Sequence, residues 1–209
     1  MEIEQELKKA LAELRKNKER KFDQTADLIV NLQKFNPKKD AVNILVNLPN
    51  KIRDKKVAGF FEVRAKNIET ITPNDFKKYS DKKEMKKLVK KYDFFISQSS
   101  LMPKVATAFG RILGPAGKMP SPQLGILMNP DDKTIEELIK KISNSFKIKT
   151  IDNSIKMAIG KQSMSDENII ENIMVVFNSL VKALPRDKEN IKNIEVKFTM
   201  TKPIRIEVK

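Results

Sequence analysis

The sequence predicts an α/β protein of two domains, with the second domain inserted into the first. Three observations support this fold class. The two ends of the chain share an α+β pattern, and the C-terminal part has too few helices to stand alone. Strands and helices alternate between them, which is typical of a small parallel, doubly wound sheet. A polar, basic break runs from Pro49 to Lys56. We therefore predict an α+β domain over residues 1–51 and 146–209, and an inserted domain over residues 52–145.

The elements of the outer domain follow from hydrophobic periodicity. Apolar residues from Ile3 to Leu14 recur at helical spacing, with glutamates near the start and lysines near the end that complement the helix dipole. Ser165 stands where an N-cap of a second helix is expected, and Pro185 marks its end. The other predicted elements are a first helix over residues 2–17, strands over 25–32 and 42–48, a β-hairpin of strands 146–151 and 154–159, and a last strand over 194–200 that residues 201–208 continue past Pro203.

The inserted domain alternates strand and helix. Its predicted strands cover residues 57–63, 68–71 and 93–97, and its predicted helices cover a region after Pro73, residues 99–113 and residues 132–143. Eight lysines lie among residues 77 to 91, while Met85, Leu88 and Val89 share one helix face. This pattern favours a solvated face for the lysines.

Composition limits the possible functions. The 209 residues include 42 Lys and Arg and carry a formal net charge of +15, which favours a polyanionic partner, nucleic acid first and an anionic membrane surface second. The insertion holds eight of these surplus positive charges, so both domains are basic. The absence of histidine and cysteine excludes histidine bases, cysteine nucleophiles and zinc sites built from these residues. No apolar run approaches the roughly 18 residues that a membrane span needs. We expect a soluble, cytoplasmic protein without a cofactor.

The residues also argue against an enzyme. The acidic pairs Asp131-Asp132 and Glu136-Glu137 are explained by helix capping and dipole matching, and no GxSxG motif is present. A shaped loop over Gly110–Pro122, which we call the central loop, contains three glycines expected to allow positive φ. It offers either a tight turn or a rigid platform for an anion. It is not a phosphate-binding P-loop, because Ile112 and Met119 replace the required glycine and hydroxyl residue.

Two patches are suited to RNA. In the first, Phe22 offers a stacking face, Lys21 a phosphate contact, and Thr25 and Asp27 point to one side of a strand. The alternative places Phe22 in the core under the first helix. The second patch runs from Lys197 to Pro203 and supplies hydroxyl groups, a flexible apolar side chain and lysines that could read a 2′-OH. Its alternative is an ordinary last strand.

Several segments together resemble the large-subunit ribosomal protein L-one family. They are KFDQTADLIVNL, NPKKD, NILVNLP, KKLVKKYDFFISQSSLMP, GRILGPAGKMPSP and KFTMTKP, which occur in family order over most of the chain. The DFFISQSSLMP segment is most similar to archaeal members. The resemblance implies a discontinuous split α+β sandwich with an inserted, small, three-layer Rossmann-like domain.

The resemblance also implies partners and site residues. The partners are the ribosome, large-subunit rRNA at the mobile stalk, exit-site tRNA and the protein's own mRNA, whose translation it represses, and the free protein is a monomer. The RNA-binding positions carried over are Lys21, Phe22, Thr25, Asp27, Gly160, Lys161, Thr199, Met200 and Thr201. Arg111, Gly114 and Lys118 in the central loop are further candidates for contacting rRNA or tRNA.

This chain departs from the family pattern at three places. Thr201 replaces a glycine, Asp27 stands where glutamate is common, and the stretch from Val63 to Ile68 is too short for a crossover helix. Two other functions stay open at this point. One is a non-ribosomal regulator that binds messenger RNA alone, and the other is a nucleotide-using enzyme built on the insertion, for which no phosphate loop is present.

Overall fold

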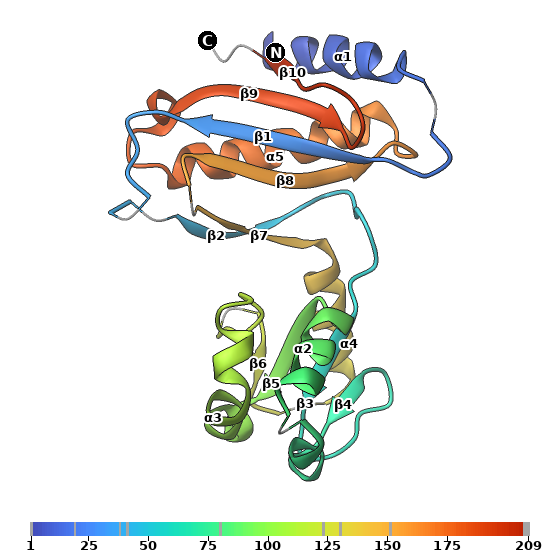
Figure 1. Cartoon of the computed structure of the whole chain (residues 1–209), viewed down its shortest axis with the longest axis vertical. Coiled ribbons are helices and arrows are strands. Elements are labelled where there is room, and N and C mark those ends of the chain that lie inside the picture. The colour runs from blue at the N-terminus through green and yellow to red at the C-terminus, as the bar shows by residue number, and fades with distance from the viewer. Residues whose placement is uncertain are drawn as a thin grey trace. The chain divides into compact units, whose positions relative to one another are not determined.

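The chain forms two compact units, which Figure 1 shows in a computed structural model. Unit 1 consists of Met1–Ile52 and Asn144–Lys209, and unit 2 of Arg53–Ser143. The structure describes residues 2–18, 20–37, 39–40, 42–79, 81–122, 124–129, 131–150 and 152–206. Both units combine helices with β-sheets, so the predicted α/β class is confirmed.

Unit 1 is built on a four-stranded antiparallel sheet with the strand order β10-β9-β1-β8. The strands are β1 (Thr25–Leu32), β8 (Ser154–Lys161), β9 (Ile191–Phe198) and β10 (Ile204–Ile206). In β1, Ala26 and every second residue after it are buried, while Thr25 and Asp27 lie on the partly exposed face. Because side chains alternate along a strand, the sheet has one face toward a core and one accessible face.

Two helices cover the buried face. They are α1 (Glu2–Arg15) and α5 (Asp166–Ala183), and α5 lies behind the sheet in Figure 1. Their apolar stripes, including Leu11 and Phe177, join the strands in one core. Ser165 caps α5 as predicted, since its hydroxyl accepts a hydrogen bond from the N–H of Asn168. The guanidinium of Arg15 bonds Asp166 at 2.6 Å, which ties the two helices together.

The predicted hairpin of residues 146–159 is wrong. The strand β7 (Ser145–Lys149) pairs with β2 (Asn43–Asn47) in a separate two-stranded sheet, whereas β8 pairs with β1. Both non-local pairings satisfy the backbone hydrogen bonds that a hairpin would have used. The predicted continuation of the last strand is also wrong, because β10 turns back and runs antiparallel to β9. Residues 207–209 lie outside the described part of the chain.

Unit 2 has a parallel sheet in the order β4-β3-β5-β6. Its strands are β3 (Val57–Phe60), β4 (Glu69–Ile71), β5 (Phe94–Gln98) and β6 (Ile126–Leu127), and its helices are α2 (Lys82–Lys91), α3 (Met102–Leu113) and α4 (Asp132–Asn144). Short 3-10 helices are η1 (Pro73–Tyr79) and η2 (Ser99–Leu101) here, and η3 (Asp187–Asn190) in unit 1. No helix lies between β3 and β4, as the short connection predicts.

The helices of unit 2 cover both faces of its sheet. Leu88 of α2 and Phe109 of α3 pack with Phe60 and Phe95 in one cluster. Ile135 of α4 packs with Ile96 in another cluster. Because alternate residues of β5 point to opposite faces, the two clusters lie on the two sides of the sheet. The result is the predicted three-layer, Rossmann-like arrangement.

The central loop begins later than expected. The helix α3 continues to Leu113, so the first four residues of the predicted loop are helical. Val105, Phe109 and Leu113 recur every four residues and are buried, and this packing outweighs the cost of about 1 kcal/mol for Gly110 in a helix. Gly117 has φ +68°, whereas Gly114 has φ −59°, so Gly117 alone among the three glycines uses the left-handed region.

Candidate nucleic-acid interface

The ends of three strands meet at one end of the unit 1 sheet. The strand β1 begins there, while β8 and β9 end there (Figure 1). Thr25 pairs with Lys161, and Ala26 pairs with both Gly160 and Phe198. We call the surface formed by residues 21–27, 160–163 and 197–201 the sheet end. It brings together all nine predicted RNA-binding positions of this unit, which come from three distant parts of the sequence.

One buried side chain holds the sheet end together. Gln24 is only 2% exposed, and its amide donates to Oε1 of Gln162 at 3.0 Å and accepts from the N–H of Met200 at 3.0 Å. The backbone carbonyl of Gln24 also accepts a hydrogen bond from the backbone N–H of Gln162 at 2.7 Å. A satisfied buried polar group of this kind rigidifies its surroundings. From the sequence, Gln24 falls within the first RNA patch but has no assigned role, although its alternation with buried Ala26 and Leu28 is a signal that it points inward.

Threonines close the turn after β9. The N–H of Thr25 donates to Oγ1 of Thr199 at 3.0 Å, and the N–H of Thr199 donates to the carbonyl of Thr25 at 3.1 Å. Oγ1 of Thr201 accepts from the N–H of Phe198 at 2.9 Å. Positive φ occurs at Lys34 and Asp187 and at no other described non-glycine residue, so the backbone at Thr201 is free of strain and does not require a glycine. Its hydroxyl stabilises the turn instead.

Two large apolar side chains stand out from this framework. Phe22 is 51% exposed and Met200 is 57% exposed. The alternative that placed Phe22 in the core is therefore wrong. An exposed aromatic ring beside fixed hydroxyl and amide groups is suited to stacking on an unpaired base. Lys21 is exposed next to it.

The remaining positions have mixed roles. Gly160 is buried, and a Cβ at this position would meet Cγ1 of Ile169 at 3.0 Å, so the glycine lets β8 approach α5 closely. The Nζ atom of Lys161 lies 3.5 Å from Oδ2 of Asp23. Partial burial raises the pKa of Asp23, but hydrogen bonds from the hydroxyl and N–H of Ser163 and the charge of Lys161 hold it below the ordinary value overall. Lys161 is thus partly neutralised within the sheet end.

Asp27 lies on the accessible face and pairs with Lys197 across the strands. Burial raises the pKa of Asp27, and the positive charge of Lys197 opposes this rise. The carboxylate is acceptor-only when ionised, and in that form it can receive a hydrogen bond from a 2′-OH or a base amino group.

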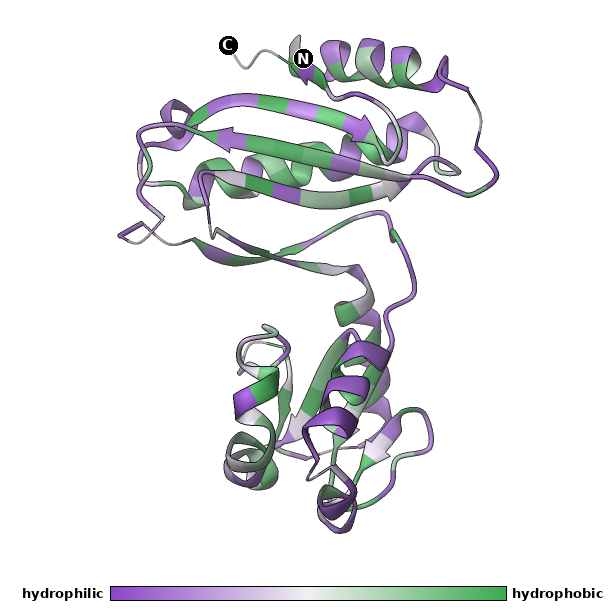
Figure 2. Ribbon diagram, in the orientation of Figure 1, coloured by the Kyte–Doolittle hydropathy of each residue, from purple (hydrophilic) through white to green (hydrophobic). Residues whose placement is uncertain are grey.

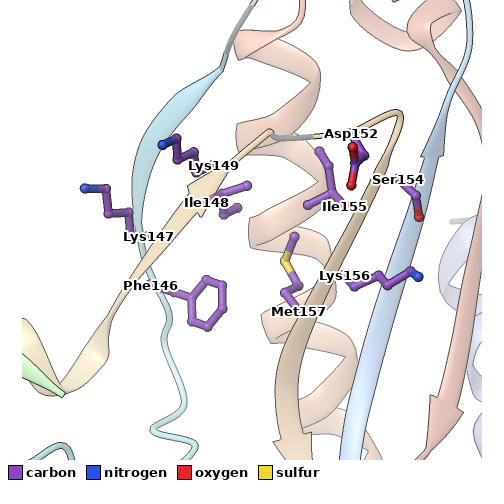
Figure 3. Close-up of a pocket in the computed structure, with 9 residues that line it drawn as sticks. All are labelled: Phe146, Lys147, Ile148, Lys149, Asp152, Ser154, Ile155, Lys156 and Met157. Atoms are coloured by element: carbon purple, nitrogen blue, oxygen red, sulfur yellow. The ribbon is translucent and has the colours of Figure 1, made fainter. Parts of the chain in front are cut away.

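A groove of about 370 Å³ lies between β7 and β8 (Figure 3). It exists because these strands do not pair with each other. The ring of Phe146 projects into it, whereas Lys147 and Lys149 of the same strand point away from it. Among the residues that the structure describes, Ser154 has a buried hydroxyl without a hydrogen-bond partner, and no group of acidic side chains could hold a metal.

The three central-loop candidates belong to unit 2, whereas the sheet end belongs to unit 1. Arg111 is exposed in the last turn of α3, and Gly114 follows as the C-cap. The ammonium of Lys118 donates to the carbonyls of Val89 and Tyr92, each at 2.7 Å. These carbonyls belong to the end of α2, so Lys118 caps that helix.

These features define a class of protein: a two-unit α/β protein with an inserted Rossmann-like unit and a polar, partly aromatic surface at one sheet end. Residues 14–202 match the family described as "Ribosomal protein L1p/L10e family". The chain belongs to this family, which confirms the resemblance seen in the sequence.

Curated relatives agree with this assignment, and each is named "Large ribosomal subunit protein uL1". The protein of Pyrobaculum islandicum is 32% identical over 95% of this chain and 91% of its own length. That of Nanoarchaeum equitans is 33% identical over 92% of this chain and 95% of its own length. That of Thermoplasma acidophilum is 33% identical over 96% and 95%, respectively. The similarity thus spans both units and supports an archaeal-type member. None of the described helices is long and apolar enough to cross a membrane.

Proposed function

We propose that the protein is a structural, non-catalytic constituent of the large ribosomal subunit and binds large-subunit rRNA at the mobile stalk. Relatives that match over most of the chain carry the name of a large-subunit protein. The observation that supports RNA binding most strongly is the sheet end, where exposed Phe22 and Met200 flank a framework held by Gln24. A ribosomal protein of this kind resides in the cytoplasm.

The sheet end would recognise a folded RNA shape. Phe22 would stack on an unpaired base, and the hydroxyl of Thr199 and the carboxylate of Asp27 would meet 2′-OH groups or base edges. Lys21 and Lys161 would neutralise phosphates and supply the salt-dependent share of the affinity. Because Gln24 already fixes the segments around Gln162 and Met200, little conformational entropy would be lost on binding.

Two finer functions are part of the proposal and rest on the family resemblance. The protein would assist the release of deacylated tRNA from the exit site. It would also repress its own messenger by binding an RNA fold that imitates the rRNA site. One surface holds one RNA at a time, so rRNA and messenger would compete for a monomeric free protein.

A salt titration tests the rRNA assignment. The complete chain is titrated with a stalk-junction rRNA fragment and with a generic RNA duplex of equal length. If five to eight phosphates are neutralised, log K falls with log salt with a slope of roughly −4 to −6. We expect the junction to bind more tightly and to keep its advantage as salt rises. Equal affinities that weaken together would show that the net charge of +15 explains all binding and would refute the proposal.

A second experiment separates the ribosomal protein from a regulator that binds messenger RNA alone. Both would use the sheet end, so RNA affinity does not distinguish them. Co-sedimentation with large ribosomal subunits after a high-salt wash does, because a structural constituent stays bound and a regulator of messenger RNA is washed away.

A further inference from the structure

Helix α2 carries the densest exposed positive charge of unit 2 that the described residues form. Six of its ten residues are exposed lysines. Lys87 pairs with Glu84 at 2.7 Å, and Lys91 pairs with Glu69 at 2.9 Å. The other four have no acidic partner among the residues that the structure describes. We call these four, Lys82, Lys83, Lys86 and Lys90, the lysine face.

The lysine face follows from helix geometry. Leu88 is buried and Met85 and Val89 pack against the same core, so the opposite side of α2 must face solvent. In Figure 2 the helix is mostly hydrophilic. Residues four apart are neighbours on a helix, with a rise of about 6 Å between them, so Lys82, Lys86 and Lys90 form one row. Like charges at this spacing repel one another.

Both ends of α2 are fixed. At the first turn, the carboxylate of Asp81 accepts a hydrogen bond from the N–H of Lys83 at 3.2 Å. At the last turn, Lys118 bonds the carbonyls of Val89 and Tyr92. The row of ammonium groups therefore stands on a rigid element with capped ends. Lys118 itself is used in this support, which removes it from the set of free cations in unit 2.

A negatively charged partner would relieve the repulsion within the row. Lysines recognise phosphates as point charges, and a row of them without aromatic or amide groups can follow a backbone but cannot read bases. Because the proposed function makes RNA the polyanion that this protein meets, and this inference rests on it, we choose RNA as the partner. We propose that the lysine face of α2 binds the phosphate backbone of RNA, as a second contact that does not depend on base sequence.

Two RNAs could supply these phosphates, namely rRNA that flanks the stalk junction and the tRNA. The test therefore uses both, each alone, with the complete chain. The variant Lys82→Gln/Lys86→Gln/Lys90→Gln removes three charges from α2. Its control, Lys133→Gln/Lys140→Gln/Lys141→Gln, removes three charges from exposed lysines of α4 in the same unit. Thermal unfolding of both variants verifies the fold.

The readout is the slope of log K against log salt. Each lost phosphate contact should reduce the magnitude of the slope by about 0.7 to 0.9. For at least one of the two RNAs, we expect the magnitude of the slope to be smaller by about 2 to 3 in the α2 variant than in the unmodified chain. The α4 variant should keep the slope of the unmodified chain. The RNA that responds identifies the source of the phosphates.

Equal slopes for the two variants on both RNAs would overturn the inference. So would binding to phosphatidylserine vesicles that requires the α2 lysines while the RNA slopes stay unchanged, since the partner would then be a membrane surface. Failure of the proposed function looks different. In that case the unmodified chain shows no preference for the junction over a duplex, whatever the α2 variant does.

Discussion

The sheet end of unit 1 and the lysine face of unit 2 are both suited to RNA, but they are built in opposite ways. At the sheet end, buried Gln24 and bonded Thr199 hold polar groups in place beside an exposed aromatic ring. On α2, six exposed lysines supply positive charge. Fixed hydroxyl, amide and aromatic groups select a shape, whereas lysines supply affinity that salt removes. The two proposals together assign specificity to the sheet end and salt-dependent affinity to the lysine face.

The largest expected effect tests whether the two surfaces depend on separate cores. Phe109 is 1% exposed, and its ring centroid lies 5.1 Å from those of Phe60 and Phe76. Phe109→Ala should lower the free energy of unfolding of unit 2 by about 3 to 5 kcal/mol. Hydrogen exchange would report this loss in α2 and α3. At one salt concentration, the variant should still bind the junction fragment more tightly than a duplex. Loss of this preference would contradict the idea that the two surfaces depend on separate cores.

The next change removes specificity at the sheet end. Thr199→Val with Met200→Ala takes away the hydroxyl that accepts from Thr25 and an exposed apolar side chain. Binding to the junction fragment should weaken by about 1 to 3 kcal/mol, while duplex binding changes little. The control Thr199→Ser with Met200→Leu keeps both kinds of group and should bind as the unmodified chain does. An unchanged junction affinity in the first variant, with an intact fold, would place the site elsewhere.

Lys118 distinguishes a structural lysine from a binding one. Lys118→Met removes charged donors from two carbonyls at the end of α2. We expect unit 2 to lose about 1.5 to 3 kcal/mol in denaturant unfolding, because hydrogen bonds to charged groups contribute about that much. The salt slope of RNA binding should not change. Arg111→Met, at an exposed position, is the matched control and should leave stability unchanged. A smaller slope for Lys118→Met would return this residue to the RNA contacts.

The smallest effect concerns pH and is confined to unit 2. The hydrogen bond from Lys78, followed by those from Thr72, lowers the pKa of Asp75 from 3.8 to about 2. A carboxyl whose pKa is lower in the folded state stabilises the fold at any pH above its unfolded-state pKa. This contribution is lost as the pH falls through the folded-state pKa. Unit 2 should therefore lose stability between about pH 4 and pH 2. Asp75→Asn should be less stable than the unmodified chain at pH 6, and this difference should shrink to a small remainder at pH 2 in urea unfolding. A constant difference across this range would argue against the assignment.

Much of the fold was predictable from local patterns. Alternating burial marks the eight residues of β1, and the helical period marks α5 together with its Ser165 cap. The alternation of strands and helices predicted the three layers of unit 2. Part of the candidate site was predictable: Phe22 and Met200 were chosen for their chemistry, and the structure exposes both. The assignment of these residues to RNA stays a prediction.

By itself, the sequence determined most of the longer helices and strands, which face of each is apolar, and the family to which the chain belongs. Only the tertiary structure decided which strands are neighbours, that Gln24 joins two distant loops, and that Lys118 caps α2. The physical reason is that side-chain periodicity reports the faces of an element, whereas its edges carry backbone donors and acceptors that are the same in every residue but proline. Those edges pair wherever the whole chain brings them together, as β7 does with β2 and β8 with β1.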